Sequence, residues 1–403
     1  MEQPVSLAKN VEFLRRLPKL NGFNGFGAHR SMLEPGRRSP IVEVTGFGSN
    51  PGGLQMFSYV PEHLQRGRAL VVVLHGCGQT AAAYDLGAGW STLAKHYGFA
   101  LLMPQQQPSN NANTCFNWFN PEDTARDHGE ARSIRQMIAR MVCDHRIDPH
   151  RIFVTGLSAG GAMTSVMLAT YPELFAGGAV IAGLPFGVAS NMREALNGML
   201  QSPSRPAGEL GDLVRHASPH KGPWPKLSVW HGSADRTVNP ANADEIVKQW
   251  LDVHGLPPAP MSEGIVDGYP HRVWWNADGE TIVESYTITD MAHGTPLGMA
   301  DNDQRYGEQG AFLIEAGISS SYHIASFFGL TEAMSQRKVA AKEASDPVPQ
   351  PAPTPARTPD IAVALQPLTT VNRPAKPVRP SPRTRIDIGA VITRALTAAG
   401  LMK

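Results

Sequence analysis

Ser158 lies in a short glycine-rich segment of the kind that can turn a serine into a nucleophile. The pentapeptide GLSAG at 156–160 follows a β-rich stretch at 151–155 and precedes an apolar-periodic stretch at 162–171. A tight turn between strand and helix strains the serine backbone, and the flanking glycines leave room for neighbouring chains. The pattern predicts a nucleophile elbow that exposes Ser158 at the carboxyl end of a sheet.

An elbow serine needs an acid and a histidine base, and both follow it along the chain in folds of this kind. Asp235 lies in the polar turn at 231–238, directly after an apolar stretch at 226–230 that we expect to be a buried strand. His293 follows the alternating stretch at 283–288, which indicates a last strand. We therefore expect Asp235 and His293 to complete a catalytic triad.

The fourth element of such a site is a pair of amides that bind the oxyanion. The near-continuous apolar run at 68–74 indicates a strand buried on both faces, and it leads into a loop at 75–80. One donor in this architecture is the amide of the residue after the nucleophile, here Ala159. The loop supplies the other, for which Cys77 is best placed.

Four residues are candidates for contact with substrate. Trp118 and its neighbour Phe119 provide aromatic surface, and Asn117 precedes them. Core packing is the alternative for the aromatic pair, because buried tryptophan usually serves packing first. His75 follows the strand at 68–74. The preferred interpretation for it is a hydrogen-bonding role that positions its own loop, and contact with substrate is the alternative.

Strands and helical patterns alternate from residue 41 to 330, which predicts an α/β fold with a mostly parallel sheet flanked by helices. The apolar fraction of 42% suits a globular core. Residues 189–222 interrupt the alternation. Two interpretations stay open for this insertion, a lid over the site or an ordinary surface excursion.

Five motifs in order resemble the polyhydroxybutyrate depolymerase family of serine esterases, which is related to feruloyl and acetylxylan esterases. They are LHGCGQ at 74–79, CFNWF at 115–119, IDPHRIFVTGLSAGGAM at 147–163, HGSADRTV at 231–238 and AHG at 292–294. The resemblance implies an α/β-hydrolase fold and ester hydrolysis through an acyl-enzyme. It implies the triad Ser158, Asp235 and His293, with the amides of Cys77 and Ala159 as oxyanion hole.

Three hypotheses for function follow. A serine esterase acting on poly- or oligo-(3-hydroxyalkanoate) esters leads, and a carbohydrate esterase that releases acetyl or feruloyl groups shares every catalytic residue with it. The third is a granule- or partner-binding protein with a vestigial hydrolase core. Histidines and acids lack the spacings that place metal ligands on one face, so we expect neither metal nor cofactor.

The three cysteines leave one question open. Cys77 and Cys115 both lie in loops at the expected active-site face and could form a bridge that clamps the oxyanion loop. Two free structural thiols are the preferred interpretation, because a reducing compartment opposes a disulfide. Cys143, in the apolar-periodic helical stretch at 134–145, is expected to fill the core.

Composition divides the rest of the chain. We expect an N-terminal arm at 1–40, a catalytic domain at 41–330, a proline-rich linker at 346–382 and a C-terminal amphipathic helix at 386–403. The helix could dock on its own domain, on a second copy of the chain, on a polymer surface or on a partner protein.

Charge and hydropathy limit the partners. A net charge of +1 gives no reason to expect nucleic acid, and no apolar run is long enough to cross a bilayer. A secretory signal is not visible, which favours the cytoplasm, although relatives in the resembled family are often extracellular. The expected partner is an ester substrate, either a polyester or oligomer or an acylated carbohydrate.

Overall fold

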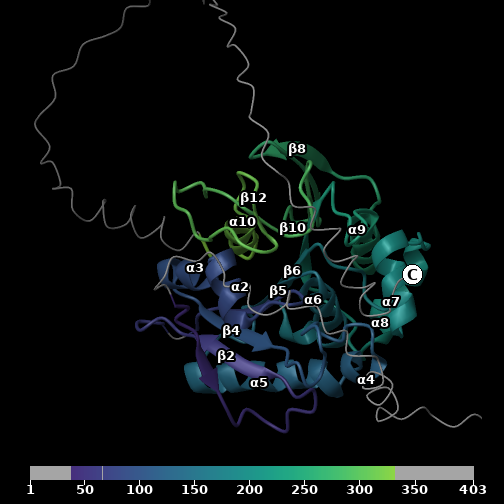
Figure 1. Ribbon diagram of the computed structural model, residues 1–403. Helices are drawn as coiled ribbons and strands as arrows, with labels where there is room; N and C mark the ends of the chain where they lie inside the picture. Colours follow the sequence, from purple (N-terminus) through teal and green to yellow (C-terminus); the bar gives the residue numbers. More distant parts are fainter. Residues whose placement is uncertain (1–37, 66, 332–403) are drawn as a thin grey trace, which may run out of the picture. The chain divides into compact units, whose positions relative to one another are not determined.

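The structure is a computed structural model that describes residues 38–65 and 67–331, and a ten-stranded sheet runs through this part of the chain (Figure 1). Its strands are β1 (Val42–Val44), β2 (Gln55–Tyr59), β3 (Leu70–Leu74), β4 (Ala100–Gln105), β5 (Ile152–Leu157), β6 (Gly177–Ile181), β7 (Lys226–Gly232), β8 (Ser262–Val266), β9 (Tyr269–Trp275) and β10 (Thr281–Ile288). The order is β1-β2-β4-β3-β5-β6-β7-β10-β9-β8.

The middle of this sheet is parallel. Strands β4, β3, β5, β6, β7 and β10 pair in parallel, while β1, β2, β9 and β8 pair antiparallel at the two edges. All five residues of β3, the sequence LVVVL, are buried. A strand buried on both faces needs apolar residues at every position, and this explains why the run at 68–74 shows no polar alternation.

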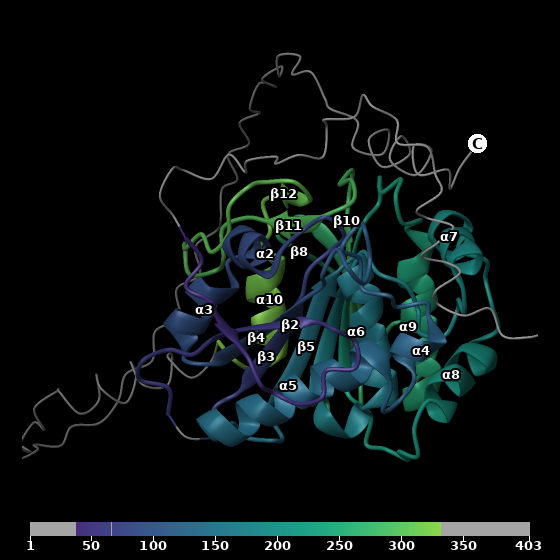
Figure 2. The same cartoon turned by 60° about the horizontal axis from the view of Figure 1, so that its bottom comes forward.

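Helices cover both faces of the sheet, as Figure 2 shows. Leu70 and Val72 belong to the apolar core on one face, and Val71 and Val73 to the core on the other. Helices α5 (Gly129–His145), α6 (Ala159–Thr170) and α9 (Ala241–His254) contribute to the first core; α2 (Ala81–Ala88), α3 (Trp90–Tyr97) and α10 (Ser320–Phe327) contribute to the second. The predicted α/β-hydrolase arrangement, a mostly parallel sheet flanked by helices, is confirmed.

The insertion at 189–222 is folded. It contains α7 (Met192–Gln201) and α8 (Ala207–His216), and Asn191 caps α7 by accepting a hydrogen bond from the Glu194 amide. The buried Gln249 of α9 donates to the Leu210 carbonyl, which ties α8 to the first core. The insertion is therefore folded and packed on α9, and its role as a lid over the site stays a hypothesis.

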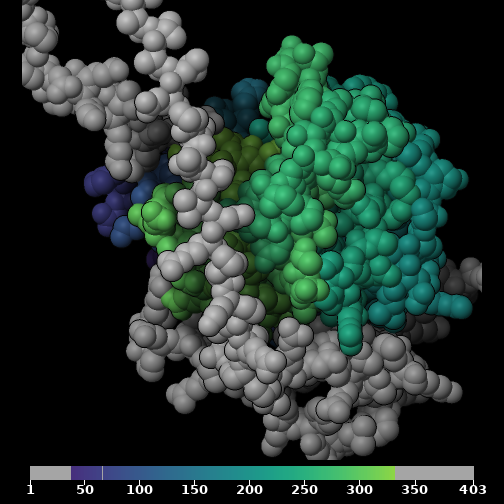
Figure 3. All heavy atoms as spheres, turned by 90° about the horizontal axis from the view of Figure 1, so that it is seen from above, coloured from purple at the N-terminus to yellow at the C-terminus, as the bar shows by residue number. Residues whose placement is uncertain are grey.

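The remaining elements are short. They are α4 (Pro121–Thr124), the 3-10 turn η1 (Pro172–Leu174) and the parallel pair β11 (Thr295–Leu297) and β12 (Leu313–Glu315). Strand β8 forms one edge of the large sheet, and four of its five residues are exposed. Figure 3 views the molecule from the side on which β8 lies.

Two observations concern the wider organisation. No helix among residues 38–65 and 67–331 is long and apolar enough to cross a membrane. The predicted linker at 346–382, the predicted helix at 386–403 and nearly all of the predicted arm at 1–40 lie outside the described residues.

Candidate active site

The predicted site residues follow the carboxyl ends of four parallel strands. Strand β3 leads into the loop that begins at His75, β5 ends directly before Ser158, β7 precedes Asp235, and β10 precedes His293. Because parallel strands point the same way, their carboxyl ends meet at one edge of the sheet, where ligands bind in open α/β folds. The topology thus brings all four segments to a common edge.

Ser158 has the backbone of a nucleophile elbow. Its φ of 58° and ψ of −117° lie outside the backbone conformations that residues other than glycine ordinarily adopt. It stands at the N-cap of α6, but its side chain makes no capping hydrogen bond, so the hydroxyl is not used by the helix. A Cβ at Gly160 would lie 2.3 Å from the Leu74 carbonyl oxygen, which explains why this position requires glycine.

His293 and Asp235 meet as predicted. His293 Nδ1 lies 2.7 Å from Asp235 Oδ2, and both residues are buried. Ionised aspartate only accepts hydrogen bonds, so Nδ1 carries the proton and Nε2 is left with a lone pair. This tautomer is the one that a general base needs.

Asp235 is held by more than His293. Its Oδ1 accepts hydrogen bonds from the amides of Thr237 and Val238, and Oδ2 lies 3.2 Å from His231 Nε2. Burial alone would raise the pKa of this carboxyl, but the hydrogen bonds from His231 and His293 outweigh burial and hold the pKa well below its usual range. The carboxylate is therefore charged and fixed in orientation.

The predicted oxyanion donors lie on the loop after β3 and at the start of α6. Within the described residues, no hydrogen bond engages the amide of Cys77 or that of Ala159.

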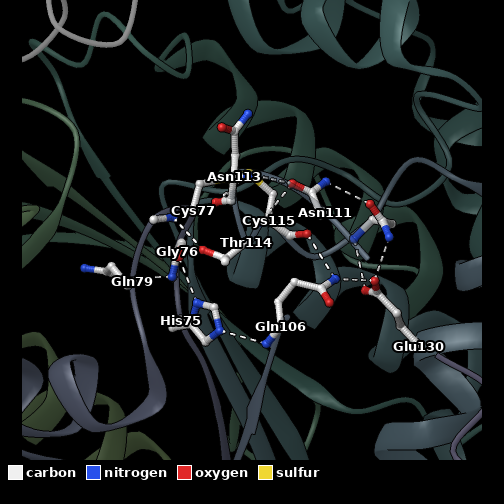
Figure 4. Close-up of a disulfide and its surroundings, with 12 residues drawn as sticks. His75, Gly76, Cys77, Gln79, Gln106, Asn111, Asn113, Thr114, Cys115 and Glu130 are labelled. Carbon is white, nitrogen blue, oxygen red and sulfur yellow. Dashed lines mark hydrogen bonds between the residues drawn. A yellow bond between two sulfur atoms is a disulfide. The ribbon is translucent and has the colours of Figure 1, made fainter. Parts of the chain in front are cut away.

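Cys77 and Cys115 form a disulfide, which joins the loop after β3 to the loop after β4 (Figure 4). The bridged alternative is thus the one observed, and the preference for two free thiols was wrong. The expectation for Cys143 was wrong too, because this thiol lies on the exposed side of α5.

The structure places His75 and Asn117 in the support of these loops. His75 is buried, with Nδ1 2.8 Å from the Gly76 carbonyl oxygen and Nε2 accepting from the Gln106 amide at 3.1 Å. Asn117 donates through both its amide and its side chain to the buried Glu130. These hydrogen bonds favour the positioning role for His75 and give Asn117 a supporting contact. Contact of Asn117 with substrate stays a prediction.

Trp118 packs in the first core and meets the ring of Phe119 edge to face at 5.5 Å between centroids. Its side chain is mostly buried, with 8% exposed. The packing alternative accounts for this environment. Contact of Trp118 with substrate stays a prediction.

Three supporting residues have no counterpart in the predicted site: Gln106, Glu130 and His231. His231 stands four residues before Asp235 within the motif HGSADRTV, and this spacing was the available signal. Glu130 is the second residue of α5, four residues before the apolar period of that helix, and an acid ahead of such a period was its only signal. Gln106 gave none, because its partners lie far away in the sequence.

One group of described residues has the composition of a metal site. Ligand atoms of Asp267, Asp301 and His323 lie within 4.8 Å of one another. Both carboxylates are exposed, and Asp267 Oδ2 already accepts a hydrogen bond from His323 Nε2 at 2.8 Å. A hydrogen-bonded histidine and aspartate beside a second exposed acid do not by themselves indicate a metal centre.

Comparison with known proteins supports the sequence resemblance. The sequence model of the family described as "Esterase PHB depolymerase" matches residues 56–262. Poly(3-hydroxyalkanoate) depolymerase C of Paucimonas lemoignei is 48% identical over 291 residues, which cover 72% of this chain and 70% of that protein. Acetylxylan esterase of Coprinopsis cinerea is 34% identical and covers 64% of this chain and 69% of its own.

A further relative and a solved structure agree with these matches. Feruloyl esterase B of Neurospora crassa is 35% identical, covering 64% of this chain and 88% of that protein. The structure of an acetyl xylan esterase from Aspergillus awamori aligns with a TM-score of 0.61 at 24% identity, over 72% of this chain and 99% of that one. This structural likeness supports the fold.

Proposed function

Because the chain belongs to the Esterase PHB depolymerase family, it is a hydrolase of carboxylic ester bonds, and we propose that Ser158, His293 and Asp235 perform the hydrolysis. The observation that carries this assignment is the 2.7 Å contact between His293 Nδ1 and Asp235 Oδ2. It lies at the same sheet edge as the strained turn that presents Ser158.

The proposed reaction has two halves. Ser158 Oγ attacks the ester carbonyl carbon while its proton passes to His293 Nε2, and the resulting oxyanion accepts hydrogen bonds from the Cys77 and Ala159 amides. The protonated histidine then gives its proton to the departing alcohol oxygen, which leaves an acyl-enzyme. Water, deprotonated by His293, attacks the acyl carbon and releases the acid and free Ser158.

We propose a poly- or oligo-(3-hydroxyalkanoate) ester as the substrate. The relative named as a poly(3-hydroxyalkanoate) depolymerase is 48% identical, whereas the acetylxylan and feruloyl esterases compared here are 34% and 35% identical. Initial rates on hydroxybutyrate oligomers, polymer film and acetylated xylan test this choice. Faster release of acetate from xylan than of hydroxybutyrate from oligomers would favour the carbohydrate esterase instead.

Replacing the nucleophile tests the catalytic assignment. We expect Ser158→Ala to lower kcat on a nitrophenyl ester by roughly four to six orders of magnitude, as loss of a triad nucleophile does. The hydroxyl caps no helix, so the variant should unfold at nearly the wild-type temperature. Ser190→Ala, at an exposed serine before α7, is the matched control. A folded Ser158→Ala enzyme with turnover near that of the control would exclude Ser158 as nucleophile.

A further inference from the structure

The peptide group between Gly76 and Cys77 is held by a hydrogen bond to its carbonyl oxygen. His75 Nδ1 lies 2.8 Å from the Gly76 carbonyl oxygen, as Figure 4 shows. In a trans peptide the C=O and the N–H point in opposite directions within one plane. The hydrogen bond that holds the Gly76 oxygen therefore also sets the direction of the Cys77 N–H.

We infer that His75 is a positioning residue that aims the Cys77 amide at the oxyanion, and that Gln106 and Glu130 hold His75 in the required tautomer and place. This inference rests on the proposed function, because it assigns a task to the oxyanion loop of that same site. It concerns orientation, so none of the three side chains touches substrate.

The tautomer of His75 follows from its second contact. The Gln106 amide can only donate, and it lies 3.1 Å from His75 Nε2, so Nε2 must carry a lone pair. The proton then sits on Nδ1, where it points at the Gly76 oxygen. Burial against Phe116, with ring centroids 5.0 Å apart, lowers the pKa of His75 to about 4 and keeps the ring neutral.

Gln106 is itself anchored by a buried carboxylate. Its side-chain nitrogen donates to Glu130 Oε1 and to the Cys115 carbonyl oxygen. Glu130 also accepts from the amide and the side chain of Asn117, at 3.0 and 2.8 Å. Burial, together with the nearby Asp123, raises the pKa of Glu130 to about 8, and the hydrogen bonds from Asn117 and Gln106 oppose this rise. Each carboxyl oxygen receives at least one N–H, as a fully buried acid requires.

This network and the disulfide act on the same peptide from two sides. Gln106 holds His75 through its backbone and Cys115 through its side chain, and Cys115 is bonded to Cys77. The disulfide restrains where the Cys77 Cα lies. It does not fix the rotation of the Gly76–Cys77 peptide plane. The Gly76 oxygen accepts one hydrogen bond from the Gln79 backbone N–H at 3.2 Å, and His75 adds the shorter one at 2.8 Å, so we assign the larger part of this restraint to His75.

The first test distinguishes the effect of losing the His75 hydrogen-bond donor from the effect of losing its imidazole ring. His75→Leu removes the proton that grips the Gly76 oxygen, whereas His75→Asn keeps an N–H donor the same number of bonds from the backbone as Nδ1. We expect His75→Leu to lower kcat about 10²-fold, near the effect of losing one oxyanion donor, with KM changed by less than about 3-fold. His75→Asn should recover most of the lost kcat.

A transition-state analogue and a matched variant complete the design. Affinity for a boronic acid inhibitor should fall in parallel with kcat in His75→Leu, because the boronate occupies the oxyanion site. His254→Leu is the control: this histidine also contacts a backbone carbonyl, that of Pro225, but lies on α9. If His75→Leu does not fold, Glu130→Gln takes its place in the test. The side-chain amide of the new glutamine would turn N–H groups toward the Gln106 and Asn117 donors and weaken the network. We expect this variant to have a lower kcat and an unchanged KM.

The outcomes are distinct. Equal kcat in the folded His75→Leu and His254→Leu enzymes, or in Glu130→Gln and wild type, would overturn the inference. So would equal losses in His75→Leu and His75→Asn. If Ser158→Ala abolishes turnover in the same series, such results leave the proposed function standing, whereas an active Ser158→Ala enzyme would refute that function itself.

Discussion

Asp235 shares one carboxylate oxygen between two histidines. Oδ2 lies 2.7 Å from His293 Nδ1 and 3.2 Å from His231 Nε2, and His231 Nε2 also lies 3.0 Å from the Val238 carbonyl oxygen. An N–H on His231 Nε2 can donate to both the Asp235 carboxylate and the Val238 carbonyl oxygen. His231 Nδ1 is buried without a partner among the described residues, which agrees with a fixed Nε2–H tautomer. His231 thus holds the acid that orients the base.

We therefore expect the donor at position 231 to matter for turnover. His231→Leu should lower kcat on a soluble ester by roughly 10-fold, because a loosened Asp235 no longer fixes the tautomer of His293. His231→Gln, whose side-chain nitrogen can take the place of Nε2, should lose much less. Steady-state kinetics of the two folded variants provide the comparison, and equal activity in both would contradict a role for the hydrogen bond.

Residue types and spacing were sufficient to predict the pairing of Asp235 with His293, because chain order and strand ends fix where an acid and a base can lie. For His75 they indicated a loop-positioning role but not its partners, and for Asn117 they gave no sign of the contact with Glu130. The task of each depends on Gln106 or Glu130, partners that come from other elements. A sequence shows that a histidine stands beside a site, but its hydrogen bonds exist only after the chain has folded.

The elements that carry the site were predictable to within a few residues. The β-rich stretch at 151–155 corresponds to β5 at Ile152–Leu157, and the alternating stretch at 283–288 to β10 at Thr281–Ile288. Helix α5 differs more, since its apolar period begins at residue 134 but the helix begins at Gly129. Its first turn carries Glu130, whose burial depends on partners rather than on periodicity.

At the scale of elements, the disulfide ties the loop after β3 to the loop after β4. It closes 38 residues, and the loss of chain entropy in the unfolded state predicts about 4 kcal/mol of stabilisation. We expect the double variant Cys77→Ser/Cys115→Ser to unfold at lower urea concentration and to turn over a soluble ester more slowly. Cys143→Ser, at the exposed free thiol, serves as control. A double variant as stable and active as this control would show that the bridge contributes little.

For the whole molecule, a partly buried neutral histidine makes stability depend on pH. Burial lowers the pKa of His254 to about 4, while an unfolded chain binds the same proton near pH 6.5. Between these values the unfolded state holds more protons, so the free energy of unfolding falls as the pH falls from about 6.5 toward 4. From pH 7 to pH 5 this one group should cost about 2 kcal/mol.

The measurement compares how much the free energy of unfolding changes with pH in the wild type and in a His254 variant. His254→Gln removes the titration and keeps a donor toward the Pro225 carbonyl. Urea unfolding at pH 7 and pH 5 should show wild type losing about 2 kcal/mol more than the variant, because contributions from every other group cancel. Equal losses in both proteins would mean that His254 is protonated in the folded state at pH 5.

The last prediction concerns how much of the chain the chemistry requires. Ser158, Asp235, His293 and the oxyanion loop all lie within residues 38–331. A chain that ends at residue 331 should therefore turn over a soluble nitrophenyl ester within about 2-fold of the full chain, since strand β10 and helix α10 are complete before that point. Co-sedimentation with polymer granules, measured for both chains, tests separately whether residues 332–403 contribute to binding an insoluble substrate. A folded truncated enzyme that has lost soluble-ester turnover would place part of the catalytic unit after residue 331.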